Sequence, residues 1–183
     1  MANTLSRSLH DVGLSAWFGG TLANAVSLNE AAAQAGSPAR SGAVANEGWD
    51  RWTPVNAAAI GLHLAGSLGQ LAGNTERLKA QQGVGTMSLV KTGVTAAALG
   101  VTAYSRLLGK KMSEQHDVPA QSGTEPTVNT PTEVARAQRQ LALLQWAVPA
   151  LTGALVVISA FAGEQQRPNK VVDGITERLR RNG

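Results

Sequence analysis

Four long stretches of the chain contain no Asp, Glu, Lys or Arg, and they constrain the fold more than any other feature of the sequence. They cover residues 12–29, 52–75, 92–105 and 140–163, and the segments between them are polar. The most apolar part, residues 141–162, would form a helix of about 33 Å, enough to cross the roughly 30 Å hydrocarbon core of a bilayer. This alternation of charge-free and polar segments predicts four membrane crossings.

The charge-free stretches are rich in Ala, Gly and Thr rather than Leu. We therefore expect an all-α fold, a four-helix transmembrane bundle with Ala/Gly-rich packing faces. The alternative is a soluble, Ala-rich helical bundle, which would need a polar face on every helix. We expect one membrane domain over residues 1–170 and a short basic tail over 171–183. The predicted helices cover residues 8–34, 54–79, 87–109 and 131–163, and a flexible linker covers 112–129.

Small residues recur at every fourth position of the second stretch, so they would form one strip along a helix. The strip consists of Ala57, Gly61, Ala65, Gly69 and Gly73. Such strips allow two helix backbones to approach closely in lipid. We expect this strip to be the central packing surface of the bundle.

Proline and threonine mark two of the predicted helix starts. Thr53 precedes Pro54, which suits the first helical position because its missing N–H costs nothing there. Residues 35–51, rich in Gly and Ser, are then expected to be a loop. Thr130 and Pro131 give the same start signal for the fourth helix.

Composition excludes several classes of function. The chain has no cysteine, so it has no disulfide and no thiolate metal site. It contains no nucleotide-binding loop, nucleophile elbow or zinc-protease motif, and we expect it not to be an enzyme. The net charge is +4, but no aromatic residues alternate with the basic ones, which argues against a nucleic-acid partner.

Four polar residues are the candidates for ligand binding: His10, Asn24, His63 and Gln70. An ionisable group inside a membrane helix indicates a functional site, and His63 lies midway along its charge-free stretch. Gln70 lies seven positions after His63 and shares its helix face, while Asn24 is the expected polar neighbour of His63. Two histidines on different helices could also ligate haem b, although His10 is predicted near the surface and His63 near the centre.

The segment LHDVGLSAWFGG, with His10, Trp17, Gly19 and Gly20, resembles the first helix of copper-resistance-D-type and related small bacterial multi-pass proteins. The resemblance covers about twelve residues. It implies a shared multi-pass fold and copper handling. The three methionines do not cluster with a histidine, so the sequence itself predicts no metal site.

These features predict a small integral membrane protein that acts as a structural or accessory component, or that assembles with itself. The expected partners are the lipid bilayer and either further copies of the chain or another membrane protein. The alternative is a binder or transporter of a small ligand, haem or metal that uses the polar residues inside the bundle. Basic residues divide almost evenly between the two predicted sides, with a slight excess that favours cytoplasmic termini of a multi-pass cell-membrane protein.

Overall fold

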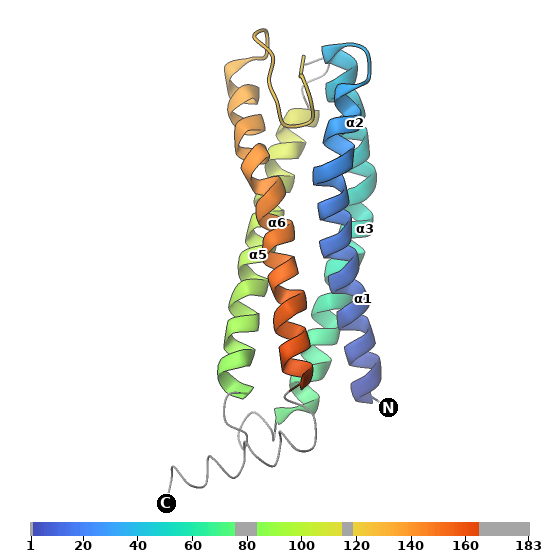
Figure 1. The fold of residues 1–183 in the computed structure, drawn as a ribbon, viewed down its shortest axis with the longest axis vertical. Coiled ribbons are helices and arrows are strands. Elements are labelled where there is room, and N and C mark those ends of the chain that lie inside the picture. The colour runs from blue at the N-terminus through green and yellow to red at the C-terminus, as the bar shows by residue number, and fades with distance from the viewer. Residues whose placement is uncertain (1, 76–83, 115–118, 165–183) are drawn as a thin grey trace, which may run out of the picture.

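The computed structural model describes residues 2–75, 84–114 and 119–164, and these residues are almost entirely helical. Four helical rods run alternately up and down one axis (Figure 1). The rods are α1 (Ala2–Ala23) continued by η1 (Asn24–Leu28) and α2 (Asn29–Ala33), then α3 (Pro38–Gly73), α5 (Val84–Ser113) and α6 (Thr132–Glu164). The predicted all-α fold is confirmed over the described residues, where the β structure is limited to an isolated bridge. We call the end that holds the start of α1 the lower end.

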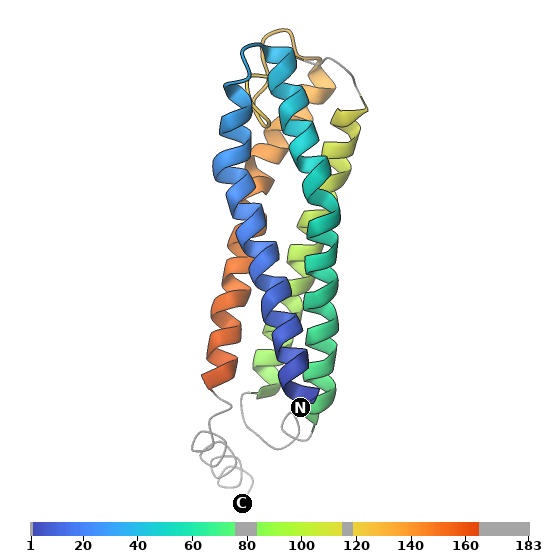
Figure 2. The ribbon, with the colours of Figure 1, turned by 90° about the vertical axis from the view of Figure 1, so that its right-hand side faces the viewer.

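The helices pack as a ring that is closed on three sides. α1 packs along α3 over most of its length, as both views show, and it also contacts α6, which packs along α5 (Figure 2). Contacts between α3 and α5 are few. The bundle is therefore loosely closed between these two helices.

Helix α3 begins at Pro38, so the loop predicted over residues 35–51 is wrong for most of its length. The Ser37 side chain accepts a hydrogen bond from the backbone N–H of Arg40 at 3.4 Å, and Pro38 occupies the first turn. The chain thus carries a second, earlier capping signal of the same Ser/Thr–Pro type. This signal starts a helix that continues through the glycines of the expected loop.

Thr53 and Pro54 consequently lie inside α3 and do not start it. The Thr53 hydroxyl donates to the carbonyl oxygen of Trp49 at 2.8 Å, a bond to the preceding helical turn. Pro54 has no N–H for that turn, which the long helix tolerates. In α6 the described helix begins at Thr132, close to the predicted start.

Most of the small-residue strip predicted as the central packing surface lies on the outer side of α3, and Gly69 is the member that faces α1. Ala57, Gly61 and Ala65 are exposed, and a Cβ built on Gly61 would meet nothing within 4 Å. The inward stripe lies on the opposite face and repeats at spacings of four and three, the period of a helix packed against a neighbour. Its members are Trp52, Asn56, Ala59, His63, Gly66 and Gln70.

Close approach of α1 and α3 depends on two other glycines. A Cβ on Gly13 would overlap the backbone of Ala59 and His63, and a Cβ on Gly66 would overlap the backbone of His10. Each helix contributes one glycine, so the two backbones are in direct contact at this crossing. The principle behind the predicted strip holds, but Gly13 and Gly66, which lie outside the strip, make the backbone contacts, while within the strip Gly69 packs against the side chain of Ser6.

The loop over residues 119–130 packs on the upper end of the bundle. The Ala120 N–H donates to the carbonyl oxygen of Pro38 at 3.0 Å. Gly123 is buried and lies so close to the Asn29 side chain that it leaves no room for a Cβ. These contacts tie the loop to the α2–α3 turn.

The flexible linker predicted over residues 112–129 is therefore wrong in its described part. Its first residues belong to α5, which ends at Ser113, and its last residues form the packed loop. Residues 115–118 and the predicted basic tail over 171–183 lie outside the described residues.

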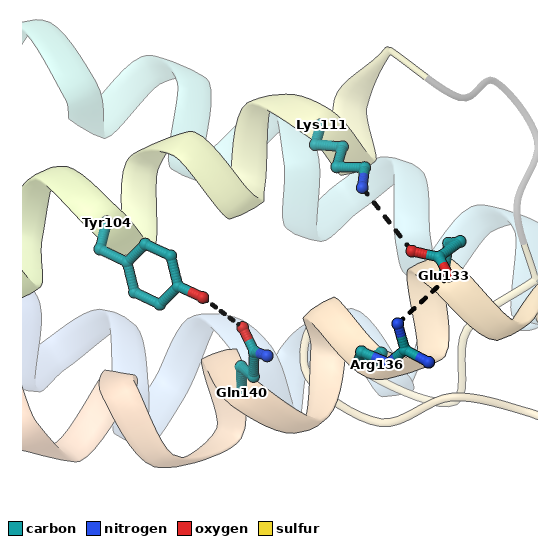
Figure 3. A network of polar contacts seen from close by, with 5 residues as sticks. All are labelled: Tyr104, Lys111, Glu133, Arg136 and Gln140. Carbon is teal, nitrogen blue, oxygen red and sulfur yellow. Dashed lines mark hydrogen bonds and ion pairs between the residues drawn. The ribbon is translucent and has the colours of Figure 1, made fainter.

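Exposed polar contacts join α5 and α6 near the upper end (Figure 3). The Tyr104 hydroxyl donates to Gln140 Oε1 at 2.7 Å, and Glu133 pairs with Lys111 at 3.8 Å and with Arg136 at 3.3 Å. Exposed ion pairs contribute little stability. They show, however, that the first turns of α6 are polar and that its apolar part begins below them.

Among the described residues, α6 is the one helix long and apolar enough to cross a bilayer, and only 22% of its apolar window is buried within the chain. Its exposed side chains include Leu143, Trp146, Val157 and Phe161. A core helix of a water-soluble bundle would bury most of such a window. An exposed apolar surface of this kind indicates contact with lipid or with another protein.

Candidate functional site

One apolar layer closes the middle of the bundle. Trp17, Ala59, Ala98 and Val148 form a buried cluster with one member from each rod. Each member lies inside one of the four charge-free stretches. The stretches are therefore level with one another, and polar groups below this layer are separated from those above it.

His10 and His63 lie directly below the layer and contact each other. Their ring centroids are 4.6 Å apart with an interplanar angle of 46°, and the centroid of Trp17 lies 6.0 Å from that of His63. Both histidines are almost completely buried, with 1% and 0% of their surface exposed. The expectation that they lie at different depths is wrong, because α1 and α3 are antiparallel and the glycine crossing brings His10 level with His63.

Asp11 fixes which nitrogen of His10 carries a proton. The Asp11 carboxylate lies 2.7 Å from His10 Nδ1. Since a carboxylate only accepts, Nδ1 must donate, and in the neutral ring Nε2 then keeps a lone pair. His10 Nε2 and both nitrogens of His63 have no hydrogen-bond partner of acceptable geometry among the described residues. Buried polar atoms without partners are rare and mark places where a ligand or water would bind.

A cavity of about 220 Å³ opens beside His10 at the lower end. It lies between α1, α3, α5 and α6 and is lined about equally by polar and apolar surface. We call it the lower cavity; its polar residues are Arg7, His10, Asp11, Ser15, Gln70, Lys91 and Ser159. Gln70 Nε2 and Ser159 Oγ are buried and have no hydrogen-bond partner in the part of the chain that the structure describes.

The charges around the lower cavity do not balance. Arg7 and Lys91 bring two positive charges, and Asp11 brings one negative charge. Arg7 lies 3.9 Å from the Asp11 carboxylate, whereas Lys91 is attracted by Asp11 but is not within ion-pair distance of a described carboxylate. The described lining of the cavity therefore has a net positive charge, and half-buried Lys91 has no ion-pair partner among the described residues.

Sequence reasoning finds part of this site. His10 and Gln70 line the lower cavity and His63 lies behind His10, as candidate ligand-binding residues should. Asn24 does not join them, because it begins η1 roughly three turns above Gly13, where its buried Nδ2 has no partner within the described ranges.

The sequence analysis missed Arg7, Asp11 and Lys91. A signal was present, since Asp11 immediately precedes one charge-free stretch and Lys91 immediately precedes another. In the structure both line the lower cavity together with Val156 and Ser159, inside the apolar part of α6. An ionisable group that lines a cavity beside apolar side chains is a candidate functional residue.

The histidine pair does not fit a haem held between two imidazoles. That arrangement needs the two rings on opposite faces of the macrocycle, whereas the rings of His10 and His63 pack directly on each other. Among the described residues no group of three or more His, Asp or Glu side chains is placed to hold a metal ion. The site is suited to a small polar ligand instead.

No known protein family matches the sequence, and neither the curated proteins nor the solved structures contain a match. The resemblance of the first helix to copper-resistance-D-type proteins thus stays a prediction.

Proposed function

We propose that this chain is a multi-pass membrane protein that binds a small organic anion in the lower cavity. The observation that carries the proposal is the meeting of Arg7, His10 and Lys91 at one cavity of net positive charge. A charge beside apolar surface is costly unless it has a partner, so several donors that converge on one cavity favour a bound anion.

Four crossings are supported by the common level of the charge-free stretches. Trp17, Ala59, Ala98 and Val148 each come from one stretch and form one layer. If the apolar part of α6 lies in hydrocarbon, the other three rods lie beside it at the same depth. Exposed Leu and Val side chains on α3 and α5, such as Leu62, would then face lipid rather than water.

An anion is favoured over a cation by the donors that surround the cavity. Arg7 and Lys91 present N–H groups, Gln70 Nε2 is an unpaired donor, and the Ser159 hydroxyl is free to donate. Asp11 is engaged by His10 and lies near Arg7. The apolar half of the lining and the volume of about 220 Å³ suit a carboxylate with a small hydrocarbon group.

Equilibrium binding of labelled benzoate to the purified protein in detergent tests this proposal. Lys91→Met removes the unpaired charge with little change in volume, and we expect it to weaken binding about 10- to 100-fold, the value of a charge-assisted hydrogen bond. Lys110→Met removes an exposed lysine from the upper part of α5 and is the matched control. The proposal fails if the two variants bind alike, or if neither benzoate, acetate nor phosphate binds to the parent protein.

Self-assembly is the second candidate, and one observation favours it. Thr92, Ala96 and Gly100 form a small-residue strip on α5 that remains exposed, and a Cβ on Gly100 would meet nothing within 4 Å. This strip could pack against another copy of the chain or an accessory partner in the membrane. Chemical crosslinking in membranes should capture a dimer that Gly100→Ile abolishes, and recovery of monomer alone would exclude self-assembly.

A further inference from the structure

A second cavity, of about 310 Å³, lies above the Trp17 layer and has a different character from the lower cavity. Its surface is mainly apolar, and it lies chiefly between α3 and α5, where the bundle is loosely closed. We call it the upper cavity. Its lining includes Trp49, Trp52, Asn56, Ile60, Leu99 and Thr102.

Three polar atoms of the lining have no hydrogen-bond partner among the described residues. They are Trp52 Nε1, Asn56 Oδ1 and Thr102 Oγ1, and all three are buried. Trp52 and Asn56 are four residues apart on α3, so their side chains are neighbours on one face. The set offers one N–H donor, one carbonyl acceptor and one hydroxyl.

The hydroxyl of Thr102 differs from the other hydroxyls on α5. Thr92, Thr95 and Ser105 each donate to the carbonyl oxygen four residues earlier, at 2.8 to 2.9 Å. That bond satisfies a helical hydroxyl without any external partner. Thr102 does not make it, so its hydroxyl remains available to a bound molecule.

The aromatic wall of the upper cavity is held in place by α1 and α2. A Cβ on Gly20 would overlap the ring of Trp52, so the indole sits directly on the α1 backbone. Trp49 Nε1 donates to Asn29 Oδ1 at 3.2 Å, and Asn29 Nδ2 donates to Gln145 Oε1 at 2.6 Å. The polar groups of Trp49, Asn29 and Gln145 are thereby engaged, and the unpaired atoms are left to a ligand.

We propose that the upper cavity binds the ring of an uncharged, lipid-soluble phenol, such as an alkylphenol or a hydroquinone. The phenolic O–H donates to Asn56 Oδ1, and the same oxygen accepts from Trp52 Nε1. The Thr102 hydroxyl forms a hydrogen bond with the second ring oxygen of a ligand that has one, such as a hydroquinone. An aromatic ring suits a wall made of two indoles, and an alkyl tail can leave between α3 and α5.

A matched pair of ligands tests the proposal in detergent: 4-octylphenol and octylbenzene, which differ by one hydroxyl group. Binding is followed by quenching of tryptophan fluorescence and by native mass spectrometry, which counts bound molecules. We expect one molecule of octylphenol per chain, bound at least tenfold more tightly than octylbenzene, because each recovered hydrogen bond contributes severalfold in affinity.

Two variants locate the site. Asn56→Leu removes the acceptor and keeps the volume, so it should abolish the preference for octylphenol while retaining octylbenzene binding. Thr86→Val changes an exposed hydroxyl of α5 that lies outside both the upper cavity and the small-residue strip, and it should leave the preference unchanged. A thermal unfolding curve checks that both variants are folded.

Equal affinity of the parent protein for the two ligands would overturn the proposal, as would a preference that survives Asn56→Leu. A phospholipid that co-purifies one to one and that octylphenol does not displace would also overturn it, since the cavity would then hold an acyl chain. The outcome is independent of anion binding, because the upper and lower cavities lie on opposite sides of the Trp17 layer.

Discussion

The glycine crossing of α1 and α3 predicts a large difference between two chemically identical substitutions. Gly13→Ala places a methyl group against the backbone of Ala59 and His63, which cannot rotate away as a side chain could. Gly61→Ala places the same methyl group where nothing lies within 4 Å. Both substitutions gain the same helix propensity, up to about 1 kcal/mol, so this gain cancels in the comparison.

The remaining difference is the cost of separating two packed backbones. Overpacking of this kind costs about 1–3 kcal/mol, which corresponds to roughly 2–12 °C in the midpoint of thermal unfolding for a chain of this size. Thermal unfolding of both variants in the same detergent measures it, with Gly66→Ala as an independent repeat on the partner helix. If the midpoint of Gly13→Ala lies within one degree of that of Gly61→Ala, the close contact between α1 and α3 does not exist as described.

Three further predictions concern polar groups. Asn29→Leu removes the donor to Gln145 Oε1 and the acceptor of Trp49 Nε1, both in partly buried positions, so we expect unfolding free energy to fall by about 1–3 kcal/mol in chemical denaturation. Asp50→Ala removes a 2.7 Å ion pair to Arg106 whose side chains are 44% and 40% exposed, so it should cost less than about 1 kcal/mol, and the loss should shrink further in high salt. His63→Leu replaces an imidazole whose two nitrogens have no hydrogen-bond partner among the described residues, and a rise of about 1 kcal/mol in unfolding free energy is expected, whereas a fall would mean that the ring has an unrecognised partner.

The sequence predicts the number and order of the helices well, because long charge-free runs between polar segments are a strong signal. The start of α3 was misjudged for a specific reason. Residues 35–51 contain glycine, serine and proline, which usually mark loops, yet Ser37 and Pro38 act together as a capping signal. Local composition alone does not distinguish a loop from the start of a helix.

The packing face of α3 could have been found from a different pattern. The chosen strip repeats every four residues, which drifts around a helix, whereas the inward stripe alternates spacings of four and three and so stays on one side. That stripe contains His63 and Gln70, which the sequence predicts as ligand-binding residues rather than as packing residues. The pairing of His10 with His63 depends on the relative height of two antiparallel helices, and no single stretch of sequence contains that information.

Single-cysteine labelling tests the four-crossing arrangement most directly, because the chain has no native cysteine to remove. Thr4 and Thr75 are exposed at the lower end, and Ser37 and Gln121 are exposed at the upper end. Each is replaced by cysteine, one at a time, and treated in intact cells with a maleimide that does not cross membranes. We predict that one pair reacts in intact cells and that the other pair reacts only after the membrane is opened. Reaction of all four positions from the same side would contradict a bundle that crosses the bilayer four times.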